Sequence, residues 1–181
     1  MLDLQAHLIG NTIKLIPLQA DHWSSLMQAA SDPLIWQLHP EPLRYLPEVF
    51  QSVFAGGLKS GGAFLICDKL TDEVLGTTRY YDFDAKNKSV AIGYTFLVRS
   101  RWGGATNTEL KQLMLAHAFA AVETVWFHVG ENNLRSRRAV HRGRSAQRCF
   151  MLSPKQTGSS LYLTKINRQK LSKTTGHGEL I

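Results

Sequence analysis

The segment Arg101-Trp102-Gly103-Gly104-Ala105-Thr106-Asn107-Thr108-Glu109 decides the fold, because it joins a clear strand pattern to a clear helix pattern. Two adjacent glycines let the backbone take unusual torsion angles and approach a ligand closely. The helix start that follows presents free N–H groups and the positive end of the helix dipole, which suit a phosphate or a pyrophosphate. Thr106 and Glu109 have the spacing of a capping box, which would fix the first turn. A tight turn whose glycines only serve backbone geometry stays open as the alternative at this point.

Strand patterns precede this loop. Residues 89–98 alternate in character, which predicts that one face of a strand carries Val90, Ile92, Tyr94, Phe96 and Val98. Two further strand-like stretches lie before it, at residues 63–68 and 73–83, and the connections between the three are short and polar. Connections of this kind are typical of an antiparallel meander.

The N-terminal part of the chain predicts a strand followed by helices. Residues 8–16 read as one strand, and a helix capped by Asp21 follows it. Four prolines make residues 31–47 a loop with short helical turns. A second short helix at 48–58 is closed by its own glycine pair, Gly56–Gly57.

The chain after the glycine loop changes pattern. Residues 108–122 carry apolar side chains at helical spacing, residues 124–129 alternate as a strand, and residues 132–140 begin another helix. Strand, loop, helix and strand in this order form a crossover unit, so the strands 89–98 and 124–129 are expected to lie parallel and adjacent. The fold class is therefore mixed α/β (α+β), and beyond residue 140 only 159–166 reads as a strand.

Length, charge and cysteine usage restrict the class of protein. The 181 residues suit one domain, and 44% hydrophobic residues can bury a core. Residues 1–140 hold 13 Lys/Arg and 13 Asp/Glu, whereas 141–181 hold eight Lys/Arg and only Glu179, so the whole net charge of +7 lies in the last part. We therefore expect a domain at 1–140 and a basic, atypical C-terminal segment at 141–181. No apolar run reaches the ~20 residues of a membrane span, no secretory signal begins the chain, and neither Cys67 nor Cys149 lies in a metal motif, which favours a cytoplasmic protein without a metal.

Three segments in this order resemble the GNAT superfamily of acetyltransferases: Ile92-Gly93-Tyr94-Thr95, Trp102 to Lys111, and Asn132-Asn133-Leu134-Arg135-Ser136-Arg137-Arg138-Ala139. They are most similar to the branch related to the RimJ and RimL ribosomal-protein N-terminal acetyltransferases. The N-terminal layout fits as well, with Leu15-Ile16-Pro17-Leu18, Asp32-Pro33 and Glu73-Val74-Leu75-Gly76-Thr77-Thr78. The glycine loop lacks both G-x-x-x-x-G-K-[ST] and G-x-G-x-x-G, which argues against a nucleotide P-loop and a dinucleotide fold.

The resemblance implies a GNAT-like fold, in which helices cover both faces of a mostly antiparallel sheet and the strands 89–98 and 124–129 splay apart. Acetyl-coenzyme A, the co-substrate, would lie between the splayed strands. Its pyrophosphate would bind main-chain amides of Gly103, Gly104, Ala105, Thr106 and Asn107, with Thr108 close by. Its pantetheine arm would bind Asn133 and the backbone of Phe96, Leu97 and Val98. Ser136 would lie near the sulfur and protonate the leaving thiolate.

The resemblance also departs from the family in two places. The common family loop has glycine where this chain has Ala105 and Asn107. The chain from residue 141 onward does not match the further strands of the family, and the abrupt change in charge suggests a frameshifted or otherwise altered C-terminus.

The sequence does not identify a general base. Glu73, Asp82, Asp84 and Glu131 read as strand-end or turn residues, because most charges lie on surfaces. His128 would point from the strand 124–129 towards the face opposite Phe127, where contact with the active site stays open as the minor alternative. His117 reads as a core histidine, and Cys67 as a buried apolar thiol. Tyr94 and Thr95 either line an acceptor pocket or, for Tyr94, belong to the core. The arginines at 135, 137 and 138 either bind the 3′-phosphate of coenzyme A or form a solvated helix face.

Three functions remain in competition. The leading hypothesis is an N-acetyltransferase that moves an acetyl group from acetyl-coenzyme A directly to a primary amine, either a protein N-terminus or a small amine. The second is a degenerate family member that binds acetyl-coenzyme A without turnover. The third is a nucleic-acid-binding protein with a basic tail, which the absence of an aromatic-interleaved basic patch makes the weakest.

Overall fold

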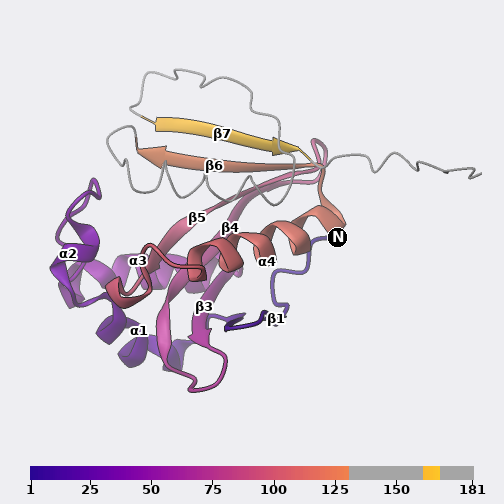
Figure 1. The fold of residues 1–181 in the computed structure, drawn as a ribbon. Coiled ribbons are helices and arrows are strands. Elements are labelled where there is room, and N and C mark those ends of the chain that lie inside the picture. Colours follow the sequence, from indigo (N-terminus) through magenta and orange to yellow (C-terminus); the bar gives the residue numbers. More distant parts are fainter. Residues whose placement is uncertain (131–160, 168–181) are drawn as a thin grey trace, which may run out of the picture.

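The computed structural model describes residues 1–130 and 161–167, which form a seven-stranded sheet covered by helices (Figure 1). The strands lie side by side in the order of the sequence. The elements are β1 (Leu8–Ile9), β2 (Ile13–Pro17), α1 (Trp23–Ala30), α2 (Pro33–Trp36), α3 (Pro47–Ser60), β3 (Ala63–Asp68), β4 (Val74–Asp84), β5 (Ser89–Leu97), α4 (Thr106–Ala121), β6 (Thr124–Gly130) and β7 (Leu161–Asn167). Two single 3₁₀ turns, Ala20–His22 and Arg99–Arg101, precede α1 and α4.

The sheet is buried on both faces. In β3, Phe64 and Ile66 pack into the core under α4, whereas Ala63, Leu65 and Cys67 pack into the core under α1 to α3. Successive side chains of a strand point to opposite faces, so a strand that is apolar at every position needs a cover on each side. The expected architecture, a mostly antiparallel sheet with helices on both faces, is confirmed. Burial raises the pKa of the Cys67 thiol, as expected for a core cysteine.

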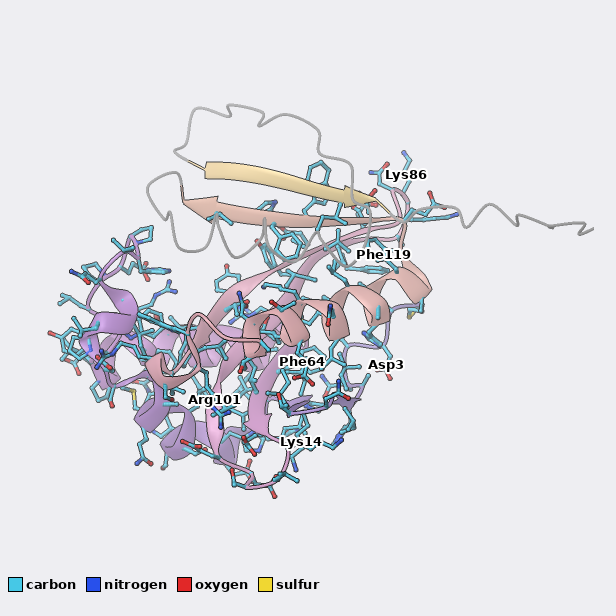
Figure 2. The ribbon with its side chains drawn as sticks, viewed as in Figure 1. Asp3, Lys14, Phe64, Lys86, Arg101 and Phe119 are labelled. Carbon is cyan, nitrogen blue, oxygen red and sulfur yellow. The ribbon has the colours of Figure 1, made fainter. Side chains whose placement is uncertain are left out.

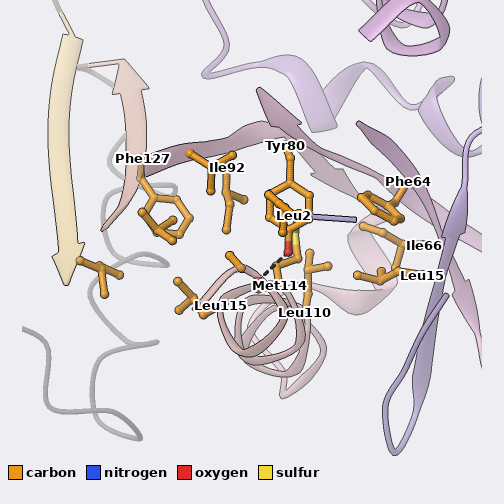
Figure 3. Close-up of a cluster of buried hydrophobic side chains, with 14 of the residues drawn as sticks. Leu2, Leu15, Phe64, Ile66, Tyr80, Ile92, Leu110, Met114, Leu115 and Phe127 are labelled. Carbon is orange, nitrogen blue, oxygen red and sulfur yellow. Dashed lines mark hydrogen bonds between the residues drawn. The ribbon is translucent and has the colours of Figure 1, made fainter. Parts of the chain in front are cut away.

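The core under α4 is centred on the middle of that helix (Figure 3). Tyr80 is 1% exposed, and its hydroxyl donates to the carbonyl of Met114 at 2.6 Å. Phe64 packs edge-on against the Tyr80 ring, with 5.7 Å between the ring centroids. Each fully buried side chain of this size contributes about 1.5–3 kcal/mol. This core therefore fixes α4, and with it the glycine loop at its start, against the central strands.

The second core is aromatic and contains Trp23, Trp36 and Phe50. The indole of Trp36 donates to the carbonyl of Ala30 at 2.8 Å, and its ring lies 5.0 Å from that of Phe96 on β5. Trp23 packs against Phe50 with 6.2 Å between ring centroids. The proline-rich stretch 31–47 holds the short α2, as expected for a loop with helical turns.

Three predicted details in the N-terminal part were wrong. The single strand predicted at 8–16 is a hairpin of β1 and β2, because the chain reverses at Gly10, whose N–H donates to the carbonyl of Ile13. Asp21 does not cap α1; it lies in the 3₁₀ turn Ala20–His22, and His22 occupies the N-cap. The second helix does not end at its glycine pair.

Helix α3 instead runs through the glycine pair to Ser60 and ends at Gly61, whose φ of 62° is the left-handed conformation that favours glycine at a helix end. Gly57 serves close packing, since a Cβ there would lie 2.9 Å from a methyl carbon of Leu18. Gly57 is therefore explained by its close contact with Leu18, and it does not mark the end of the helix.

The alternation predicted along 89–98 breaks at Tyr94, which has a φ of 50°. Thr77 pairs with Phe96 and Arg79 with Gly93, so one residue of β4 lies opposite both Tyr94 and Thr95. This is a β-bulge, which turns the following residues to the other face. Val90 and Ile92 accordingly lie in the core under α4, whereas Phe96 lies in the aromatic core. The prediction that one face carries all five residues was therefore wrong.

The sheet continues past β6. Strand β7 pairs antiparallel with β6 over its full length, from Thr124 opposite Asn167 to Gly130 opposite Leu161. Ile166 is 2% exposed and belongs to the core under α4. This confirms the strand predicted at 159–166. Among the described helices, none has the length and apolar character to span a membrane.

Candidate functional site

Strands β5 and β6 form a V. They pair in parallel at Ser89–Thr124, Val90–Val125 and Ala91–Trp126, and their pairing ends there, although β5 continues to Leu97 and β6 to Gly130. In Figure 1 the two strands are close at one end and diverge towards the end of the sheet where α4 begins. The splayed parallel pair is therefore confirmed. The divergent edges leave main-chain groups for an extended ligand to pair with.

Only alternate residues of β5 present their backbone to the V. The N–H of Val98 donates to the carbonyl of Leu75, and the Phe96 carbonyl lies against Gly76, so both residues turn towards β4. The main-chain groups of Leu97, between them, point to the open side because successive residues of a strand alternate. The Leu97 carbonyl accepts a hydrogen bond from the Trp102 indole at 2.9 Å. This hydrogen bond connects the edge of the V to Trp102, the residue just before the glycine pair.

The glycine loop presents free amides at the wide end of the V. Gly103 has a φ of 71°, and a Cβ built at Gly103 or Gly104 would meet no atom within 4 Å. Helix α4 starts with Ala105 as N-cap and no side-chain cap, and Glu109 is the first residue whose N–H is bonded, to the carbonyl of Ala105. Within the described residues no acceptor is recorded for the amides of residues 103–108. A helix start of this kind is an anion site.

The capping box predicted for Thr106 and Glu109 was wrong. The Glu109 carboxylate leaves its own helix and accepts hydrogen bonds from the turn between β1 and β2: from the N–H of Asn11, from the N–H of Thr12 at 2.9 Å and from the Thr12 hydroxyl at 2.5 Å. Burial raises the pKa of Glu109, but the bonds from this turn outweigh it and hold the pKa below its usual range. The helix start is thus anchored without any side chain occupying its amides.

Two ion pairs fix the strand-to-loop connection. Arg101, which is labelled in Figure 2, donates to the Asp68 carboxylate at 2.7 Å, and Asp68 lies at the end of β3. Arg99 pairs with Asp32, whose other oxygen caps α2 by accepting from the N–H of Leu34 at 3.0 Å. Ion pairs at the surface contribute little to stability, so their main effect is to position the loop.

Lys111 lies where the V narrows. Its side chain comes from α4 and is 7% exposed; its Nζ donates to the Thr95 hydroxyl at 3.4 Å and lies 5.0 Å from the centre of the Phe127 ring. Thr95 belongs to β5 and Phe127 to β6, so the amine bridges both arms. The Thr95 hydroxyl in turn contacts that of Thr78 at 2.8 Å. Burial lowers the pKa of Lys111 to about 8, which allows proton exchange near neutral pH.

A polar row crosses the opposite face of the sheet beside the same bulge. Arg79 on β4 stacks on the Tyr94 ring, with 4.1 Å from its guanidinium carbon to the ring centroid. The Tyr94 ring lies edge-on to Tyr81 at 5.2 Å, and the Tyr81 hydroxyl contacts Nδ1 of His128 at 3.0 Å. His128 lies on β6 just beyond the point where β5 and β6 separate. We call Arg79, Tyr94, Tyr81 and His128 the polar row.

The structure places the remaining candidates as follows. Glu73 and Asp82 are exposed, and Asp84 accepts from the N–H of Asn87 in the β4–β5 turn, which agrees with their interpretation as strand-end and turn residues. His117 packs against the Tyr80 ring at 5.8 Å, as expected for a core histidine. Tyr94 is 47% exposed and is therefore not a core aromatic. Lying outside the described residues are Glu131, Asn133, Arg135, Ser136, Arg137 and Arg138.

Two residues of this region escaped the sequence analysis although the sequence carries a signal for each. Lys111 shares the apolar stripe of α4 with Met114, Leu115 and Ala118, at the spacing of one helix face. Arg79 stands inside the otherwise uncharged core of β4. A charge on a buried stripe or in a buried strand is unusual enough to mark a functional site.

Comparisons with known proteins agree with this geometry. The model of the acetyltransferase (GNAT) domain family matches residues 12–143. No curated protein matches the chain. Among solved structures, a GCN5-related N-acetyltransferase from Brucella melitensis superposes with a TM-score of 0.70 at 19% identity, covering 90% of this chain and 79% of that one.

Two further similar structures contain the coenzyme. The RimL ribosomal L7/L12 α-N-protein acetyltransferase in complex with coenzyme A has a TM-score of 0.71 at 16% identity, over 90% of this chain and 97% of that one. RimJ of Mycobacterium smegmatis in complex with a coenzyme A disulfide has a TM-score of 0.64 at 18% identity, over 90% and 86%. The superpositions establish a shared fold, and the family model matches most of the chain. The chain therefore belongs to the GNAT acetyltransferase family.

Proposed function

We propose that the chain binds acetyl-coenzyme A in the V between β5 and β6 and transfers the acetyl group to a primary amine. The observation that carries this proposal is the junction of two features: a strand pair that opens, and a helix start at its wide end whose amides have no partner among the described residues. The acceptor is a protein N-terminus or a small amine. The similar structures of RimL and RimJ with coenzyme A support the choice of co-substrate.

The coenzyme would be held by backbone at both of its polar parts. The pyrophosphate would bind the amides of Gly103 to Asn107, with Thr108 close by, where the dipole of α4 adds a favourable field. The pantetheine arm would extend along β5 at Phe96 to Val98, where the Leu97 groups face the V. Asn133 and Ser136 keep the roles that the resemblance implies, pantetheine binding and protonation of the thiolate.

The reaction would be a direct attack. The neutral amine nitrogen forms a bond to the thioester carbon, the carbon–sulfur bond breaks, and the thiolate takes up a proton. A main-chain N–H at the β5 bulge would polarise the carbonyl as an oxyanion hole does. We propose His128 as the base that accepts the proton of the amine, since Tyr81 orients its ring and imidazole is the side chain that most often serves as a general base.

Coenzyme A should raise the melting temperature of the protein. Because the ligand binds only the folded state, stabilisation at a hundredfold excess over Kd is about 2.7 kcal/mol.

Gly104→Asp places a negative charge in open space at the helix start, so it should preserve the fold and weaken coenzyme A binding at least tenfold by repulsion. Gly104→Ala is the matched control and should bind normally. The measurement is the melting temperature of the three proteins with and without millimolar coenzyme A. A wild-type melting temperature that does not change with coenzyme A would refute the proposed function.

His128→Gln should lower kcat about a hundredfold and leave coenzyme A binding intact. Glutamine preserves a polar contact to Tyr81 but cannot accept the proton of the amine, and positioned acid–base groups contribute about 10²–10⁴-fold. Release of free thiol upon amine addition measures kcat, and the melt with coenzyme A measures binding. Tyr81→Phe, which removes only the orienting hydroxyl, should cost less. Full activity of His128→Gln would exclude His128 as the base.

A further inference from the structure

Arg79 is a buried cation with incomplete partners. The residue is 9% exposed on the face of the sheet covered by α1 to α3. Its Nη2 donates to the carbonyl of Val53 on α3 at 3.1 Å, and its guanidinium stacks on Tyr94. Its Nε is buried and has no hydrogen-bond partner within the part of the chain that the structure describes. A buried donor without a partner is unfavourable, so this atom calls for an explanation.

No carboxylate offsets this charge among the described residues. None of their ion pairs includes Arg79, and the charged group that acts on its pKa is another cation, Arg44. Burial, with a smaller contribution from Arg44, lowers the pKa of Arg79. A side chain that only bridged β4 to α3 would be less costly as a neutral group, because an unpaired buried charge is penalised. The buried charge of Arg79 therefore lacks an anionic partner among the described residues.

The guanidinium lines a narrow apolar pocket beside the bulge of β5. The walls come from α1, α3 and the strands, and are formed by Leu18, Leu26, Phe50, Val53, Phe54, Gly57, Ala63, Thr77, Arg79 and Tyr94. Arg79 is the charged residue among them. The pocket lies on the face opposite α4, and Tyr94 in its wall follows Ala91, where the pairing of β5 with β6 ends, by a few residues along β5. Under the proposed function, an acceptor that enters from this face would pass Arg79 on its way to the V.

The Tyr94 ring lies on the Arg79 guanidinium, and its environment allows it to rotate away. Its side chain is 47% exposed, so rotation about the Cα–Cβ bond needs no change in the core. Its φ of 50° lies in the left-handed region that non-glycine residues rarely adopt. Strained backbone of this kind clusters at binding sites. Rotation of this ring would expose the face of the Arg79 guanidinium on which it now lies.

We propose that the amine acceptor carries a carboxylate and that Arg79 binds it, with Tyr94 displaced from the guanidinium. The inference rests on the proposed function and adds the chemical class of its acceptor. The planar guanidinium suits a carboxylate because two parallel N–H groups bind its two oxygens. The carboxylate on Arg79 then holds the neutral amine of the same molecule towards the V. Arg79 thus determines which amine acceptors bind, and the acetyl transfer itself takes place at the coenzyme site.

The test compares paired acceptors on the wild-type enzyme and two variants. Each pair consists of an amino carboxylic acid and its carboxamide, with leucine, phenylalanine, β-alanine and acidic dipeptides as the acids. We expect kcat/KM of the wild type to favour the acid at least tenfold in one or more pairs. Arg79→Met should reduce this preference at least fivefold, a comparison that cancels the intrinsic difference between the two amines. Arg44→Gln, which removes a neighbouring cation, should retain it.

A binding measurement separates this inference from the proposed function. In thermal melts with coenzyme A present, the preferred acid should stabilise the wild type and not Arg79→Met, whether or not turnover occurs. Turnover without preference for any acid, or a preference that survives in Arg79→Met, overturns the inference and leaves the acetyltransferase proposal standing. Absence of turnover together with absence of acid-induced stabilisation also overturns it. Loss of coenzyme A binding by the wild type would instead refute the proposed function.

Discussion

Lys111→Met should raise the free energy of unfolding by about 3 kcal/mol at pH 7. Burial lowers the pKa of Lys111 from 10.5 to about 8, and a tenfold change in a proton-binding constant corresponds to about 1.4 kcal/mol. Methionine has a similar volume and no charge, so it fills the same space between Thr95 and Phe127 without the cost of desolvating an ammonium group. The Thr95 hydroxyl keeps its contact with Thr78, so no buried polar group is left unpaired.

The gain should depend on pH in a defined direction. Below pH 8 the lysine is charged in both the folded and the unfolded protein, so the penalty is fully present. Between pH 8 and 10.5 the unfolded chain binds a proton that the folded protein has lost, so the wild type becomes more stable as the pH rises. Urea unfolding of both proteins at pH 7 and pH 10 measures the difference. A gain of equal size at the two pH values would show that the buried charge is not its cause.

Gly76→Ala should lower the free energy of unfolding by about 3 kcal/mol or more. Its φ of 151° lies outside the range that alanine readily adopts, and a Cβ at this position would lie 2.1 Å from the carbonyl oxygen of Phe96. That oxygen belongs to the backbone of β5, so no rotamer change relieves the contact. Strands β4 and β5 would have to separate, which also disturbs the arm of the V.

Gly104→Ala is the matched control for this substitution. Its Cβ meets no atom within 4 Å, so the free energy of unfolding should change by no more than about 1 kcal/mol. Urea unfolding of both variants gives the comparison. Equal stability of Gly76→Ala and the wild type would mean that the two strands tolerate a wider spacing than this geometry allows.

The sequence was sufficient for the fold because its periodicities are local and strong. The predicted strands 63–68, 73–83 and 89–98 differ from the observed β3, β4 and β5 by no more than one residue at any end. The crossover order predicted the parallel pair, and the fixed handedness of such connections leaves few alternatives. The glycine loop could be located for the same reason, since it lies where a strand period changes to a helix period.

The site details depended on contacts between distant residues, which no local pattern reveals. Glu109 has the spacing of a capping residue, yet its carboxylate binds Asn11 and Thr12 in a turn that the strand pattern did not show. The bulge at Tyr94 interrupts an alternation that reads as continuous in sequence. Arg79 is distinctive only once α3 and β5 are known to enclose it.

The anchoring of Glu109 has a consequence for the anion site. This carboxylate lies one turn into α4, close to the very amides that would receive a diphosphate, and a free negative charge there would compete with the incoming ligand. The N–H and hydroxyl of Thr12, in the turn of the β1–β2 hairpin, instead donate hydrogen bonds to this carboxylate and hold it against the hairpin. Under the proposed function, the hairpin thus separates the Glu109 carboxylate from the bound coenzyme, and its removal is expected to weaken coenzyme A binding through repulsion by Glu109.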